Sequence, residues 1–189
     1  MKRGFATTII GLAAVIATGF EWSDDPSIRA VAKDDIHSGE RFRMLADFNS
    51  DGIQDMALSC DMRSFGNAGG QFTLYLGNAT GKYRKYGEFF AHTMAVSLEK
   101  IGTQVRLWTY CRLGGWIGQI GYYEVFEDTL SEYHSITIHP GDSGSKMGNA
   151  IYEAVIKSSD LPITVERSVT KNGVVKWIDP NRAIDGDEE

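Results

Sequence analysis

The chain has 189 residues and a formal net charge of −6, with 42% hydrophobic residues, 23% charged residues and only four prolines. This composition is typical of a globular protein with one domain or at most two small ones, and it excludes a fibre or a disordered tail protein. The negative charge, without a basic stripe, argues against nucleic-acid binding, because an acidic surface repels the phosphate backbone.

The N-terminal residues 1–19 have the three parts of a secretory signal peptide. They begin with Lys2 and Arg3, continue with an uncharged run and end in small residues, which allows cleavage after Ala17 or Gly19. A membrane anchor is the alternative, since the uncharged run reaches the lower end of the spanning range. We favour a cleaved signal, and no later segment is apolar enough to span a bilayer. The expected location is therefore the periplasm or the extracellular space.

Residues 47–55 have the spacing of a calcium loop, with oxygen-bearing side chains at positions 1, 3, 5 and 9 and glycine at position 6. Ca²⁺ takes six to eight oxygen ligands, and a chain that curls around the ion presents alternate side chains inward. Gly52 allows the sharp turn. Without a cation, the three carboxylates would repel one another at close range. The candidate ligands are Asp47, Asn49, Asp51, Ile53 through its carbonyl oxygen, and Asp55.

An EF-hand loop and a metal-free turn are the alternatives to a calcium loop of this kind. An EF-hand loop begins in the same way but requires a bidentate glutamate at position 12, where this chain has Leu58. The residues at 55–60 also alternate as in a strand rather than continuing as an amphipathic helix. A metal-free turn is the second alternative, because Asn-x-Asp-Gly is common in solvated turns. We expect a calcium loop with a structural role that leads directly into a β-strand.

The residues after the loop complete a longer pattern. Gly69 and Gly70 precede a predicted strand at 71–76, and the Gly-Asn-Ala-Thr-Gly-Lys-Tyr segment at 77–83 reads as a closing hairpin. Together with the loop, this stretch resembles the FG-GAP or VCBS-type repeat, the calcium-loop blade of integrin-like β-propellers. The resemblance covers residues 44–90 and implies that the five residues named above are the calcium ligands. No second copy of the loop follows, so we do not expect a complete propeller, which needs at least four blades.

The second half of the chain reads mainly as further strands. Strands are predicted at 103–112 and 119–127, with a glycine-rich turn between them. A helix is expected at 150–157. Additional strands are predicted at 135–139, 163–169 and 174–178, the last two joined by a Lys-Asn-Gly turn.

One face of the predicted strand at 103–112 carries large aromatic and basic side chains, opposite the apolar Val105, Leu107 and Cys111. Such side chains are enriched in protein interfaces and on sugar-binding platforms. They are equally typical of a central strand that is buried on both faces, so both interpretations stay open. The candidate binding residues are Arg106, Trp108, Tyr110, Arg112 and Trp116.

Cys60 and Cys111 are the only two cysteines of the sequence, and an even number of cysteines in an exported protein favours a disulfide. Strand alternation assigns both sulfurs to the apolar faces of their strands. The alternatives are two separate buried thiols or a metal pair, which lacks histidines at ligand spacing. We predict one disulfide, which would stabilise the fold by about 4 kcal/mol.

A protease motif is the nearest approach to catalytic chemistry in the chain. The Gly-Asp-Ser-Gly segment at 141–144 looks like the nucleophile motif of trypsin-like serine proteases, and His92 is the nearest imitation of their histidine base. Too little chain lies between the two for the double barrel of that family. A polar loop explains the segment more simply. A hydrolase with Asp and Glu residues brought together by the fold stays an alternative, because such spacing is spatial rather than sequential.

The sequence thus predicts a mainly β, antiparallel domain over residues 20–189, with at most one or two short helices. It consists of the calcium-loop unit at 44–90, a second β unit at 94–178 and an acidic tail at 179–189. The favoured function is that of an exported, non-catalytic, calcium-binding module that recognises another protein. A periplasmic inhibitor or immunity protein, with an acidic surface that covers a basic effector, is one alternative, and a hydrolase is the other.

Overall fold

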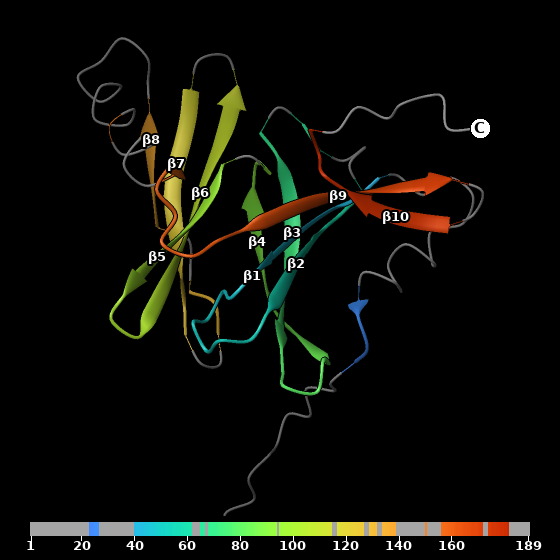
Figure 1. Cartoon of the computed structure of the whole chain (residues 1–189). Coiled ribbons are helices and arrows are strands. Elements are labelled where there is room, and N and C mark those ends of the chain that lie inside the picture. The colour runs from blue at the N-terminus through green and yellow to red at the C-terminus, as the bar shows by residue number, and fades with distance from the viewer. Residues whose placement is uncertain are drawn as a thin grey trace, which may run out of the picture.

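The described parts of the computed structural model are mainly β, as predicted, and contain two antiparallel sheets (Figure 1). The predicted leader, Trp116 and the Gly-Asp-Ser-Gly segment lie outside the described residues. The structure describes residues 23–26, 40–61, 65–66, 68–93, 95–114, 117–126, 129–131, 134–138, 150, 156–171 and 174–181.

The larger sheet contains six strands: β1 (Phe42–Ala46), β2 (Asp55–Ser59), β3 (Gly70–Gly77), β4 (Tyr83–Ala91), β9 (Thr164–Lys171) and β10 (Val174–Ile178). Their order in the sheet is β10-β9-β1-β2-β3-β4. The first four strands form a meander in chain order, which corresponds to the predicted unit at 44–90. The β9–β10 hairpin then extends this meander by pairing β9 with β1.

The smaller sheet is a second meander, made of β5 (Val96–Ile101), β6 (Gln104–Gly114), β7 (Ile117–Val125) and β8 (His134–Ile138). The strand at 174–178 has the predicted bounds, and the predicted strands that correspond to β6, β7, β8 and β9 differ from the observed ones by one or two residues at each end. Alternating hydrophobicity therefore located these strands correctly.

One apolar cluster joins the two sheets. Phe72 and Phe89 of the larger sheet are stacked with their ring centroids 5.3 Å apart, and Phe89 meets Tyr123 of β7 edge-on at 6.2 Å. Leu98 and Leu107 of the smaller sheet are fully buried in the same cluster. The buried positions alternate along β3 and β6, so each strand turns one side toward the shared core. The loop-bearing meander is thus packed on the second one.

The two cysteines correct one prediction, because Cys60 and Cys111 are both free thiols and the predicted disulfide is absent. Cys60 follows β2 in the larger sheet, where its N–H donates to the carbonyl of Gln71 at 2.9 Å. Cys111 lies in β6 of the smaller sheet, where its Sγ lies 3.8 Å from Oε1 of Gln119. Burial raises the pKa of the Cys111 thiol. Strand alternation correctly indicates that Cys111 is buried, but it carries no information on which other residue the sulfur meets.

The predicted helix at 150–157 is described only at its ends. Ala150 is helical and Lys157 lies in a bend, whereas 151–155 lie outside the described residues. Within the described parts of the chain, no helix has both the length and the apolar character that a membrane crossing requires.

Candidate functional site

The aspartate loop, residues 47–54, connects β1 to β2 and turns sharply at two positions. Ser50 has a φ of 60° and Gly52 has a φ of 84°, both in the left-handed region that L-residues rarely adopt. A Cβ added to Gly52 would meet no atom within 4 Å. Glycine is therefore favoured there by the backbone conformation and not by lack of space.

Three side chains of the loop close it by accepting hydrogen bonds from its own backbone. Asp47 accepts the N–H of Asp51 through Oδ1 at 3.0 Å and the N–H of Gly52 through Oδ2 at 2.9 Å. The N–H of Asp51 is also shared with Oδ1 of Asn49 at 3.2 Å. Asp51 in turn accepts the N–H of Ile53 at 2.8 Å. These Asx-type turns gather the side-chain oxygens of one short segment on an exposed loop.

Asp55 ends the loop in a different environment, because it is completely buried. Its Oδ2 accepts the N–H of Phe48 and its Oδ1 accepts the N–H of Gly77, each at 2.8 Å. Burial raises the pKa of Asp55 to about 7; the two N–H donors oppose this shift, and the charges of Asp51 and Asp47 add to it. Asp55 thus fastens the loop to the end of β3, and a cation nearby would favour its charged form.

The oxygen donors of the loop match the chemistry of Ca²⁺, which prefers carboxylate, amide and carbonyl oxygens. Asp47, Asn49 and Asp51 keep lone pairs for an ion, since each carboxylate or amide oxygen has two. Both oxygens of Asp55 likewise accept hydrogen bonds from backbone amides, but Asp55 is completely buried. In the described parts of the chain, no group of three or more histidine, cysteine or acidic side chains gathers closely enough to hold a metal. Hydrogen bonds therefore link Asp47, Asn49 and Asp51 to one another's part of the loop, whereas Asp55 is buried and bonded to Phe48 and Gly77.

The closing hairpin predicted at 77–83 is present and lies against the end of the loop. Oδ1 of Asn78 accepts the N–H of Thr80 at 2.9 Å and that of Lys82 at 3.1 Å, which closes the turn between β3 and β4. A Cβ on Gly77 would overlap the carbonyl oxygen of Gln54. The absence of a side chain at Gly77 therefore lets β3 approach the loop closely enough for the bond to Asp55.

A second candidate site lies on the outer face of the smaller sheet, the face that points away from the shared core. Arg106, Trp108 and Tyr110 are half-buried on this face, while the alternate residues of β6 are buried in the core. The predicted alternation of buried and less buried residues along β6 is confirmed. The face that carries Arg106, Trp108 and Tyr110 is partly exposed and not fully buried in the core. The strand β6 also includes Arg112, whose side chain lies outside the described residues, as does Trp116.

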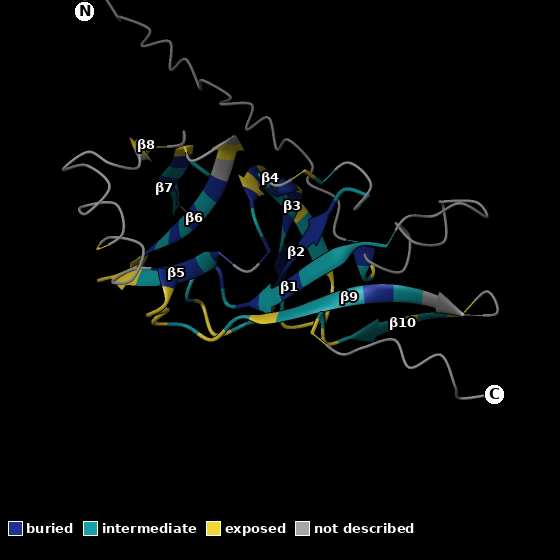
Figure 2. Ribbon diagram, turned by 90° about the horizontal axis from the view of Figure 1, so that it is seen from above, coloured by how far each residue is buried: buried dark blue, intermediate teal, exposed yellow. Residues whose placement is uncertain are grey.

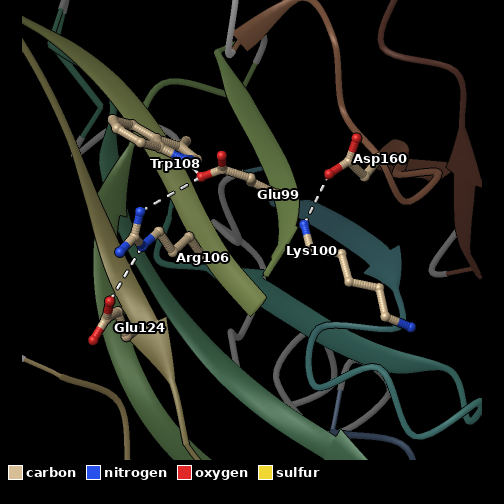
Figure 3. Close-up of polar contacts among 6 residues, drawn as sticks. All are labelled: Glu99, Lys100, Arg106, Trp108, Glu124 and Asp160. Atoms are coloured by element: carbon tan, nitrogen blue, oxygen red, sulfur yellow. Dashed lines mark hydrogen bonds and ion pairs between the residues drawn. The ribbon is translucent and has the colours of Figure 1, made fainter. Parts of the chain in front are cut away.

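Charged side chains hold the aromatic residues of the outer face in place. Nε1 of Trp108 donates to Glu99 at 2.7 Å, and Nε of Arg106 donates to Glu124 at 3.1 Å (Figure 3). Nη1 of Arg106 also lies 4.0 Å from Glu99, and its guanidinium lies 4.5 Å from the ring centroid of Tyr122. These contacts follow from strand register, which pairs Arg106 with Glu124 and with Glu99. The side chains are thus ordered without any partner.

An aromatic row crosses three strands of the outer face. The ring centroids of Trp108 and Tyr122 are 4.8 Å apart, and those of Tyr122 and His134 are 5.3 Å apart. Beside this row, Trp108 and Tyr110 pack against a small buried cluster of Ala95, Ile120 and Ile156. Sequence reasoning missed the contributions of Glu99, Glu124 and His134, because only strand pairing places them beside β6.

Comparisons with protein-family models, with curated proteins and with solved structures give no match. The structure has the expected order of loop, strand, glycine-rich turn, strand and hairpin over residues 47–83. The resemblance to the FG-GAP or VCBS-type repeat stays a prediction from those residues.

Proposed function

We propose that this chain is an exported, non-catalytic, calcium-binding β-domain that recognises another protein through the outer face of its smaller sheet. The observation that carries the proposal is the ordered group of Trp108, Tyr122 and Arg106, which are partly exposed and held in place by two glutamates. Tryptophan, tyrosine and arginine are the residue types that contribute most to binding energy in protein interfaces.

The order of these side chains favours recognition by a rigid surface. A partner that covers the outer face would bury rings whose positions are already set, so little side-chain entropy would be lost on binding. The net charge of −6 favours a partner with a basic surface, because complementary charge accelerates encounter and suppresses wrong partners. Arg106 would contact the partner within this acidic surface, and its own charge is balanced by Glu99 and Glu124.

Capture by the immobilised full chain tests the recognition surface. The wild type is compared with Arg106→Ala and Trp108→Ala, and with Lys176→Ala, which removes an exposed charge from β10 as a matched control. Proteins retained from the exporting compartment are identified by mass spectrometry. We expect one protein that binds the wild type and the control and binds the two outer-face variants at least about tenfold more weakly. Equal retention by all four chains, with circular dichroism showing each folded, would contradict the proposal.

The calcium part of the proposal assigns the ion to the aspartate loop. Asp47, Asn49, Asp51 and the carbonyl of Ile53 would hold it, and Asp55 would keep its anchoring role. Bound Ca²⁺ would neutralise the carboxylates of the loop and stabilise the connection between β1 and β2. Support comes from the all-oxygen donor set and from the turn geometry that gathers it.

Thermal unfolding in calcium and in chelator tests the ion site. Saturating Ca²⁺ should raise the melting temperature, since a ligand at a hundred times its dissociation constant stabilises the native state by about 2.7 kcal/mol. Asp51→Asn should abolish this dependence, whereas Asp179→Asn, an exposed acidic position after β10, should retain it. Equal melting temperatures of the wild type in calcium and in chelator would rule out the site.

A further inference from the structure

The two edges of the smaller sheet differ in how their backbone groups are covered. At the β5 edge, the N–H of Leu98 donates to Oγ of Ser159 at 2.9 Å and its carbonyl accepts the N–H of Asp160 at 2.8 Å. The N–H of Lys100 donates to Oδ2 of Asp160 at 2.9 Å (Figure 3). These contacts occupy three of the backbone hydrogen-bonding groups of the edge, and covering an edge is a common way of preventing strand addition.

The β8 edge has none of these protective features within its own five residues. The strand contains no Lys, Arg, Asp, Glu or Pro, although such residues commonly guard edges. Residues 134–137 of β8 are all exposed (Figure 2). Ile136 is 50% exposed. In the part of the chain that the structure describes, β8 pairs with β7 alone. An uncharged, isoleucine-rich edge is suited to pairing with another strand.

We propose that β8 pairs with β8 of a second copy of this chain, antiparallel about a two-fold axis at Ile136. The strand is self-complementary in this register. Ile136 would face Ile136 of the second copy, Ser135 would face Thr137, and His134 would face Ile138. Isoleucine pairs and hydroxyl pairs are favourable across antiparallel strands, and a two-fold interface uses the same patch of both copies.

The lack of Lys, Arg, Asp and Glu in β8 makes this edge a place where a second copy can pair without charge repulsion from the strand. Each copy has a net charge of −6, so most surfaces of two copies repel one another. The β8 pairing brings no Lys, Arg, Asp or Glu side chain of the strand against another. The two smaller sheets would become one continuous sheet, and because the axis is perpendicular to it, both outer faces would lie on the same side. The pairing uses the backbone edge of β8, whereas the proposed recognition function rests on the side chains of Arg106, Trp108 and Tyr122 in β6 and β7.

Sedimentation of the full chain over a wide range of concentrations tests the pairing. We expect a reversible equilibrium between monomer and dimer. Ile136→Lys would place two ammonium groups opposite each other at the axis and should raise the dissociation constant at least about tenfold. The control is Val174→Lys, the same type of change at a 58% exposed edge residue of β10, which should leave the equilibrium unchanged. Circular dichroism shows whether each variant is folded.

Cross-linking then tests the register. In the Ile136→Cys variant, the two position-136 thiols of a dimer would lie within disulfide range, since opposite residues of antiparallel strands have Cα atoms about 4.5–5.5 Å apart. Peptide mapping should find this cross-link rather than one through Cys60 or Cys111. Two results would each overturn the proposal: a monomer at every concentration, or a dimer that Ile136→Lys does not weaken.

Discussion

The aspartate loop and the outer face of the smaller sheet are assembled in opposite ways. In the loop, Asp47 bonds to backbone groups four and five positions away, and Asp51 bonds to one two positions away. On the outer face, Trp108 bonds to a glutamate nine positions away and Arg106 to one eighteen positions away. A site of the first kind is visible as a motif. A site of the second kind exists only once the strands have paired.

Asp55 combines the two kinds of assembly, because it belongs to the local loop motif and forms long-range hydrogen bonds. It occupies the last position of the loop motif, yet its two hydrogen-bond donors are seven and twenty-two positions away. The residue therefore connects a locally encoded turn to the packing of β3. If the two regions are assembled in these different ways, substitutions in the shared core, at Asp55 and on the outer face should change the free energy of unfolding by decreasing amounts.

The largest expected effect is that of Phe72→Ala. Phe72 is completely buried between the sheets and stacks on Phe89, so the variant should lose about 3–5 kcal/mol of unfolding free energy. Because one core serves both regions, urea unfolding followed by circular dichroism and by tryptophan fluorescence should shift together. Separate transitions for the two probes would show that the sheets unfold independently.

The next effect is a pH dependence that arises from Asp55. Its pKa is about 7 in the folded chain against 3.8 as the ordinary value, so the native state binds a proton more tightly than the unfolded state. In chelator, this contribution to stability should be complete below pH 4 and should be lost as the pH rises through 7, a loss of about 4 kcal/mol. Urea midpoints between pH 4 and pH 8 measure it.

Asp55→Asn is the control for this pH dependence. The variant cannot titrate at this position, and its single side-chain oxygen can accept only one of the two backbone N–H groups that Asp55 binds. It should be less stable at low pH but should lack the loss between pH 4 and pH 8. Parallel profiles of the two proteins would assign the pH dependence to other groups.

The smallest effect is expected on the outer face, from Trp108→Phe. Phenylalanine keeps a ring beside Tyr122 but has no N–H to donate to Glu99, so about 1 kcal/mol of unfolding free energy should be lost. Glu99→Gln keeps an acceptor oxygen and should cost less. If both variants match the wild type in urea unfolding, the contact does not order the face.

The strands themselves were predictable from particular residues. Alternation over Val105, Leu107 and Cys111 located β6 and its buried side, and the turn before Val174 located β10. The disulfide could not be predicted in this way, because alternation indicates the face on which a sulfur lies and not its neighbour. The pairing of β9 with β1 was equally invisible, since it joins Phe42 to Arg167 across most of the chain.

The sequence by itself determined the mainly β class, the positions of most strands and the turn of the aspartate loop, because hydrophobic alternation and Asx turns act over a few residues. The tertiary structure alone decided the strand order, the burial of Asp55, the absence of a disulfide and the composition of the outer face. These features depend on contacts between distant residues, and such contacts are set by how whole strands pair and pack.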